Sequence, residues 1–181
     1  MSGPLDRLDS RAESGLVNII IDTPKGSRNK FKYDEKTQCF RLSRILPAGA
    51  SFPYDFGSIP MTYAEDGDAL DVLVISEVPS FAGCLITGKL IGTISGEQTE
   101  KEKTIRNDRL LAVPITPVNP ALFAHIDDLP DAWLKEIEHF FVSYNAVKGK
   151  QFKPLGRFGP VRARRLIEEG VKQFRGGRRN K

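Results

Sequence analysis

Short apolar segments rich in β-branched residues, separated by polar turns, fill the first two thirds of the chain. Segments 28–33 and 38–46 flank the polar tetrapeptide 34–37, an arrangement that is typical of a β-hairpin. Four further segments of this kind cover residues 16–21, 71–76, 84–94 and 110–115. Their spacing and the many turns between them predict a small, mostly antiparallel barrel rather than a doubly wound sheet.

The apolar positions change to helical spacing in the last third of the chain. After Pro130 they recur every three to four residues, which predicts an amphipathic helix with the apolar face Trp133, Ile137, Phe140, Phe141 and Tyr144. A second helix is expected from Pro160, because proline is favoured at the first helical position; its apolar stripe comprises Ala163, Leu166, Ile167 and Phe174. Strands followed by helices predict an α+β fold with two C-terminal helices packed outside the barrel.

The length of 181 residues fits one domain, and 40% hydrophobic residues are enough for a folded core. We expect a flexible N-terminal arm over residues 1–15, a single domain over 16–175 and a disordered basic tail over 176–181. The formal net charge of +4 comes from the end of the chain, because residues 175–181 hold four basic residues and no acidic one. The rest is neutral, so nucleic acid is an unfavoured partner.

Membrane and secretory features are absent from the sequence. No apolar run approaches the ~18 residues that a spanning helix needs, and the first residues alternate charges without an apolar segment. Cys39 and Cys84 lie far apart and indicate reduced, buried thiols rather than a metal-binding knuckle. We therefore expect a cytoplasmic protein with no membrane partner.

The strongest chemical signal is the acidic turn Asp66-Gly67-Asp68-Ala69-Leu70-Asp71, which runs directly into the apolar segment 72–75. Three carboxylates so close together repel one another, so a cation must hold them. Hard divalent cations prefer oxygen ligands, and Mg²⁺ binds most readily where a phosphate shares its coordination. The turn thus predicts a Mg²⁺ site, against the plain alternative of a solvated acidic turn.

A phosphate site also needs cations and hydrogen-bond donors. Arg44 ends an apolar stripe on segment 38–46, a position that suits the rim of a barrel beside an anion. Lys30 lies on the paired segment of the hairpin. Tyr144 ends the aromatic helix face, so its hydroxyl can point out of the core. Each residue alone is commonplace, and only together do they indicate phosphate binding.

These elements together resemble the soluble family I inorganic pyrophosphatases. The resemblance runs from about Asn18 to Phe174 and rests on segments 51–57 and 66–74, on Lys30-Phe31, Arg44, 111–114, 139–141, Tyr144 and Gly149-Lys150. It implies a five-stranded OB-like antiparallel barrel, several Mg²⁺ ions and association into homo-oligomers. The implied activity is Mg²⁺-dependent hydrolysis of pyrophosphate to two phosphates, by in-line attack of a metal-activated water.

The resemblance also implies a role for individual residues. Asp66 and Asp71 correspond to Mg²⁺ ligands, and Asp68 to a ligand carboxylate that orients and deprotonates the attacking water. The phosphate donors would be Lys30, Arg44 and Tyr144.

Four positions depart from the family pattern. Asp22 replaces a glutamate, and is still expected to bind metal, whereas Lys32 replaces a glutamate and reverses the charge. Phe56 replaces a tyrosine. Asn145 stands where a lysine is usual, although Lys148, about one helical turn further on, can reach back to the substrate.

The second acidic loop of the family corresponds to residues 96–109, and its register is open. Counting back from segment 111–114 puts Asn107 at the position of a metal ligand in the family. It puts Arg109 at the position where the family has a substrate-binding lysine. A one-residue bulge would instead make Asp108 the ligand. Glu97 or Glu102 would supply the other carboxylate. We take Asp108 and Glu97 as the expected ligands of this loop.

Two alternatives to a pyrophosphatase remain. One is a catalytically weakened OB-like barrel that binds phosphate, nucleotide or nucleic acid; Lys32, Asn107 and Asn145 favour it, and the intact acidic turn opposes it. The other is a hydrolase of organic pyrophosphates such as nucleoside diphosphates.

Overall fold

The computed structural model describes residues 7–116 and 122–179, and five of its strands close into a ring. Around the ring, β1 (Val17–Thr23) pairs with β4 (Asp55–Ile59), followed by β5 (Leu70–Val74), β8 (Arg109–Pro114) and β6 (Leu85–Glu100), which pairs again with β1. Only the β5–β8 pair in this ring is parallel. The predicted five-stranded, mostly antiparallel barrel of an α+β fold is thus confirmed.

Two further strands extend the ring, and a hairpin lies beside it. The long strand β6 projects beyond the barrel and pairs with β7 (Lys103–Arg106) and β9 (Gln151–Phe158). A separate two-stranded sheet is formed by β2 (Asn29–Asp34) and β3 (Cys39–Ile45), the predicted hairpin. Pattern reasoning missed β4, β7 and β9. Pro154 and Gly156 obscure the last of these, because both residues are unfavourable in strands.

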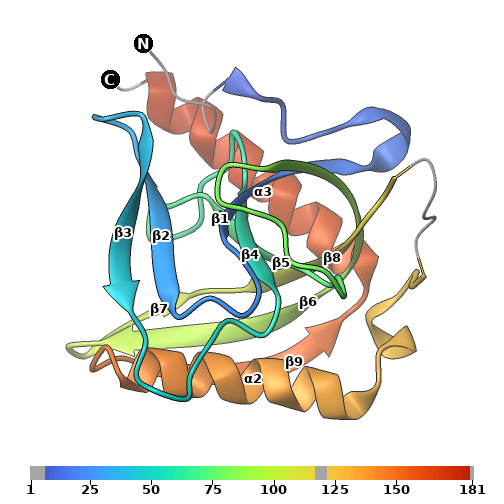
Figure 1. Cartoon of the computed structure of the whole chain (residues 1–181). Helices are drawn as coiled ribbons and strands as arrows, with labels where there is room; N and C mark the ends of the chain where they lie inside the picture. The colour runs from blue at the N-terminus through green and yellow to red at the C-terminus, as the bar shows by residue number, and fades with distance from the viewer. Residues whose placement is uncertain (1–6, 117–121, 180–181) are drawn as a thin grey trace.

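Helices α2 (Asp131–Ala146) and α3 (Pro160–Arg179) cover different sides of the barrel, as predicted (Figure 1). Short 3₁₀ turns occur at Glu13–Gly15 and Ile126–Asp128. Successive side chains of β5 point to opposite faces of the sheet, so the strand contributes to two cores. Val72 belongs to the core under α3, and Leu73 belongs to the core under α2. No helix in the described part of the chain has the length and apolar character to span a membrane.

Gly57 fixes the contact between β4 and β1. A Cβ atom at this position would lie 2.5 Å from the backbone oxygen of Ile20. Real Cβ atoms do not approach an oxygen so closely, so only glycine allows these two backbones to pair at this point. This pairing places the end of β1, with Asp22, next to Ser58.

Described residues of the expected arm and tail are more ordered than expected, while residues 1–6 and 180–181 lie outside the described part of the chain. Within the arm, Ser10 is buried, and its carbonyl accepts a hydrogen bond from the backbone N–H of Asn18 at 3.0 Å. At the other end, α3 continues to Arg179, past the start of the tail expected to be disordered from residue 176. The expectation of buried thiols is also wrong for Cys39, which is exposed, whereas Cys84 is partly buried; both are free.

Candidate active site

A cavity of about 310 Å³ lies between the β2–β3 hairpin, the loop joining β4 to β5, the β6–β8 pair and the end of α2. Charged side chains of both signs line it. The carboxylates are Asp22, Glu35, Asp66, Asp68 and Asp71, and the cations are Lys30, Lys32, Arg44, Arg109, Lys148 and Lys150.

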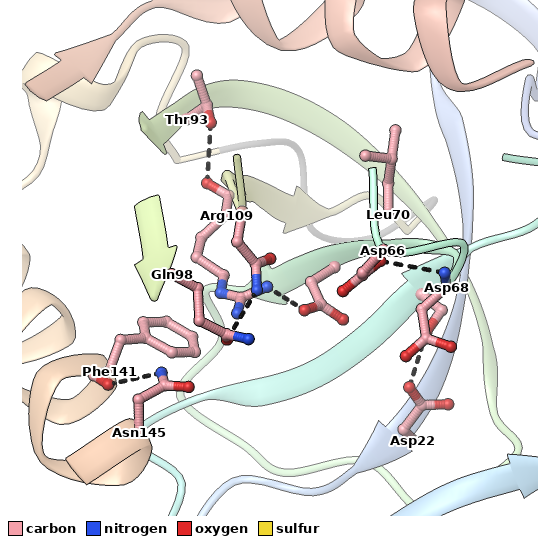
Figure 2. A network of polar contacts seen from close by, with 12 residues as sticks. Asp22, Asp66, Asp68, Leu70, Thr93, Gln98, Arg109, Phe141 and Asn145 are labelled. Atoms are coloured by element: carbon pink, nitrogen blue, oxygen red, sulfur yellow. Dashed lines mark hydrogen bonds and ion pairs between the residues drawn. The ribbon is translucent and has the colours of Figure 1, made fainter. Parts of the chain in front are cut away.

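One side of the cavity, here called the acidic wall, consists of Asp22, Asp66, Asp68 and Asp71. Three of them come from one turn, which Gly67 permits with a φ of +82°. The backbone N–H of Asp68 donates to Oδ1 of Asp66 at 3.1 Å, which closes the turn as an Asx turn. Figure 2 shows Asp66 and Asp68 on this turn and Asp22 below them. Local backbone geometry therefore holds three of the four carboxylates of the acidic wall, whereas Asp22 comes from β1.

Burial changes the acidity of two members of this wall. It raises the pKa of Asp22 to about 7, although the Ser58 hydroxyl donates to Oδ2 of this carboxylate at 2.7 Å. The other oxygen, Oδ1, is buried with no hydrogen-bond partner among the described residues. Burial also raises the pKa of Asp66, against the hydrogen bond from the backbone of Asp68. Both carboxylates gain from a cation that would stabilise their charged forms.

The opposite side, here called the amide–cation wall, consists of Gln98, Asn107, Arg109, Tyr144 and Lys148. Asn107 Nδ2 donates to Gln98 Oε1 at 3.0 Å, so two buried amides satisfy each other there. Arg109 is 4% exposed and pairs with Asp71 on the neighbouring strand β5. Its guanidinium lies 4.8 Å from the ring centre of Phe141 on α2, and both residues are labelled in Figure 2.

Lysine and tyrosine side chains crowd the end of α2. Lys148 Nζ lies 4.0 Å from the ring centre of Tyr144, and burial, with the nearby charges of Lys30 and Arg44, lowers the pKa of Lys148 to about 7. Burial also lowers the pKa of Lys30, whose Nζ lies 4.2 Å from the ring centre of Phe56. Burial raises the pKa of Tyr144 to about 12, and its buried hydroxyl has no partner in the described part of the chain. This corner is built to receive an anion.

The acidic wall has the donor chemistry of a site for a hard divalent cation. Carboxylate oxygens are the ligands that Mg²⁺ prefers, and the buried Oδ1 of Asp22 has no hydrogen-bond partner among the described residues. Asp68 and Asp71 are paired with Lys32 and Arg109, respectively. Among the residues described, no three carboxylate, imidazole or thiolate groups already converge on one point. The donor set fits a metal, and ion pairs must be exchanged when one binds.

The structure brings together most of the residues that the sequence predicted for the site. The following expected metal, catalytic and phosphate-binding residues line the cavity: Asp22, Lys30, Arg44, Asp66, Asp68, Asp71, Arg109, Tyr144 and Lys148. The suggestion that Lys148 reaches back beside Tyr144 agrees with the geometry, whereas Asn145 is buried and donates from Nδ2 to the Phe141 carbonyl at 2.8 Å.

The two acidic residues expected from the loop 96–109 are not in the cavity. Asp108 points away from it: Oδ1 accepts from the backbone N–H of Gly96 at 3.0 Å and from Arg106 Nε at 2.8 Å. Asn107 and Arg109 line the cavity instead, because successive side chains alternate in direction. The register without a bulge is therefore the correct one. Glu97 fails for the same reason, since its neighbour Gln98 is the residue that faces inward.

Sequence reasoning missed several polar residues of the cavity, Gln98 and Ser58 among them. Nothing in the local sequence singles out Gln98, because its position depends on the register of β6 against β7 and β9. Ser58 directly follows Gly57 and pairs with Asp71 in the β4–β5 ladder, so knowledge of β4 would have revealed it.

Comparisons with known proteins identify the family of this chain. The pyrophosphatase family model, described as inorganic pyrophosphatase, matches residues 19–175. An inorganic pyrophosphatase of Synechocystis sp. is 37% identical over 171 residues, which cover 94% of this chain and 99% of that protein. One of Geobacillus stearothermophilus is 35% identical over 162 residues, covering 90% and 96%. The crystal structure of an inorganic pyrophosphatase from Neisseria gonorrhoeae has a TM-score of 0.85 at 29% identity, over 94% of this chain and 98% of that one.

The family model covers most of the chain and the relatives match almost all of it. Pyrophosphate hydrolysis is accordingly favoured over the alternative of a weakened barrel that binds phosphate, nucleotide or nucleic acid. On the evidence of sequence, fold and site, the chain belongs to the inorganic pyrophosphatase family of hydrolases.

Proposed function

We propose that this chain hydrolyses inorganic pyrophosphate to two phosphates in the cavity described above, and that Mg²⁺ supports the reaction. One observation carries the proposal: the acidic wall faces a cluster of phosphate-binding cations across about 310 Å³, a volume suited to a small anion. The positions of these residues within a pyrophosphatase fold support their assignment to metal and substrate.

Asp22, Asp66, Asp68 and Asp71 would hold Mg²⁺, which would neutralise part of the substrate's charge and acidify a water molecule. Asp68 is accessible to this water, with 60% of its side chain exposed. It orients the attacking water and accepts its proton.

The cations hold the substrate. Lys30, Arg44, Arg109 and Lys148 donate to the phosphate oxygens, and the unpartnered hydroxyl of Tyr144 donates a further hydrogen bond. Cleavage adds one water across the P–O–P bridge, so that the bridging oxygen leaves with one phosphate. No covalent enzyme intermediate is needed.

A phosphate-release assay tests the proposal. The purified chain is incubated with Mg²⁺ and pyrophosphate, and in parallel with ADP and tripolyphosphate. We expect phosphate only or mainly from pyrophosphate. Release from ADP at a comparable rate would instead support a hydrolase of organic pyrophosphates, and no release from any substrate would support a binding protein.

Assembly and location belong to the same proposal. We expect the chain to form homo-oligomers. We also expect it in the cytoplasm, because its two cysteines are free, as is usual in a reducing compartment. Size-exclusion chromatography with light scattering checks the first point: a monomeric mass would contradict it.

A further inference from the structure

Lys32 is a cation in the cavity that the proposed function leaves without a role. It lies on β2, and its Nζ is 2.7 Å from Oδ2 of Asp68, the carboxylate assigned to the attacking water. The pair joins the hairpin to the β4–β5 loop across the mouth of the cavity. While it lasts, one oxygen of Asp68 is occupied by an ammonium group.

Backbone geometry on β2 aims this lysine at the site. The pairing of β2 with β3 shifts register between Lys30 and Phe31, yet both Lys30 and Lys32 line the cavity. Lys30 lies against the rings of Phe56 and Tyr144, whereas Lys32 stands at the rim. The two lysines therefore present cations at two depths of one cavity.

The ion pair between Lys32 and Asp68 is easily exchanged. The exposed fractions of the two side chains are 55% and 60%, and ion pairs between groups so accessible to water contribute little to stability. A phosphate group carries more negative charge than one carboxylate and accepts several hydrogen bonds, so it competes effectively for an ammonium group. An arriving anion can thus take Lys32 and free Asp68.

The charge balance of the cavity points the same way. Its described lining has six cationic and five carboxylate side chains, and the amides of Gln98 and Asn107 add no charge on the far wall. Fixed cations already offset the carboxylates before any metal enters. Part of the attraction for a multiply charged anion is therefore built into the protein.

We propose that Lys32 is a phosphate-binding residue, held by Asp68 in the free enzyme and transferred to pyrophosphate on binding, so that the anion binds even without divalent cations. The inference rests on the proposed function, since it names the residue that takes over substrate charge in that same site. When pyrophosphate binds Lys32, the carboxylate of Asp68 is released from its ion pair in the same step.

Metal-free binding is the direct test. Calorimetry in EDTA measures the dissociation constant of imidodiphosphate, a pyrophosphate analogue with a nitrogen bridge. We expect measurable binding by the wild type, a loss of at least about tenfold for Lys32→Glu and of roughly threefold for Lys32→Ala. Lys32→Arg should stay within about twofold of the wild type, because it keeps the charge.

Lys36→Glu is the matched control, because Lys36 lies in the same hairpin, is exposed and does not line the cavity. We expect it to bind like the wild type, and circular dichroism verifies that every variant is folded. Equal affinities of Lys32→Glu and the wild type, or no binding by the wild type in EDTA at about millimolar analogue, would overturn the inference. Phosphate release by the wild type with Mg²⁺ tests the proposed function separately.

Discussion

The two walls of the cavity are built in different ways. On the acidic wall, Asp66, Asp68 and Asp71 come from a single turn whose geometry is set by a glycine and an Asx hydrogen bond. On the amide–cation wall, Gln98, Asn107 and Tyr144 come from three elements and meet only through the register of β6 and the packing of α2. Three of the four carboxylates of the acidic wall are a local structure, joined by Asp22 from β1, whereas the other wall is wholly a product of the fold.

This difference has a chemical counterpart. The acidic wall offers oxygen ligands to a cation, whereas the amide–cation wall offers donors to an anion and no carboxylate among the described residues. If that division is correct, changes to the acidic wall should stop turnover. Changes to the other wall should mainly alter the affinity for substrate and metal.

Removal of divalent metal should have the largest effect. We expect EDTA-treated enzyme to lose essentially all phosphate release, because the metal neutralises the substrate and acidifies the attacking water. Mg²⁺ should restore the rate and Ca²⁺ should inhibit it, since Ca²⁺ is larger and less demanding in geometry. An unchanged rate after exhaustive metal removal would show that the acidic wall has another purpose.

The substitution Asp68→Asn should cause the second-largest loss of activity. The amide keeps the shape of the side chain but cannot accept the proton of the attacking water, so kcat should fall by at least about 100-fold. Calorimetry with pyrophosphate should show that the variant still binds its substrate. Residual activity within about tenfold of the wild type would move the base to another residue.

The sequence predicted those parts of the molecule whose structure is decided locally. The acidic turn, the β2–β3 hairpin and both helices all have patterns contained in a few neighbouring residues, and all are confirmed as elements of the fold. Arg44 and Lys30 could be placed near the site because they face each other in the β2–β3 ladder. The position of Lys148 beside the site could also be predicted, because it lies about one helical turn beyond Tyr144.

The remainder could not be predicted because it depends on register. A shift by one residue in a strand turns every side chain to the other face, and this decides between Asn107 and Asp108. An acidic residue looked more suitable as a metal ligand, but Asp108 holds the backbone of Gly96 instead. The same uncertainty of register applies to β6. It is the reason why Gln98 was not predicted as a cavity residue and Glu97 was wrongly predicted as one.

The pH dependence of kcat/KM should show whether the amide–cation wall binds substrate through the charge of Lys148. The pKa of Lys148 is lowered to about 7, so its charge is present below that pH and lost as the pH rises through it. Lys148→Arg stays charged throughout. We therefore expect the ratio of kcat/KM, variant over wild type, to rise by about threefold or more between pH 6.5 and 8.5. A ratio that does not change with pH would mean that Lys148 does not act as a charged donor.

Asn107→Asp should give the amide–cation wall some of the character of the acidic one. The Gln98 amide can turn to donate to the new carboxylate, so the fold should tolerate the change. Calorimetry should show Mg²⁺ affinity increased by roughly threefold, because a carboxylate is a better ligand than an amide oxygen. Asn29→Asp, at an exposed position outside the cavity, is the control; equal effects would indicate general electrostatics only.

The smallest effect on activity is expected from Asp108→Asn, which is the same chemical change as Asp68→Asn but at a carboxylate outside the cavity. Asp108 accepts hydrogen bonds from the backbone of Gly96 and from Arg106, and these weaken when its charge is lost. The melting temperature should therefore fall by about 2–5 °C, while kcat/KM stays within about twofold of the wild type. Asp68→Asn should show the reverse, with activity lost and stability kept, since Asp68 is exposed at the mouth of the cavity. If Asp108→Asn instead abolished turnover, the carboxylate of Asp108 would have to reach the metal, and the register that separates the two walls would be wrong.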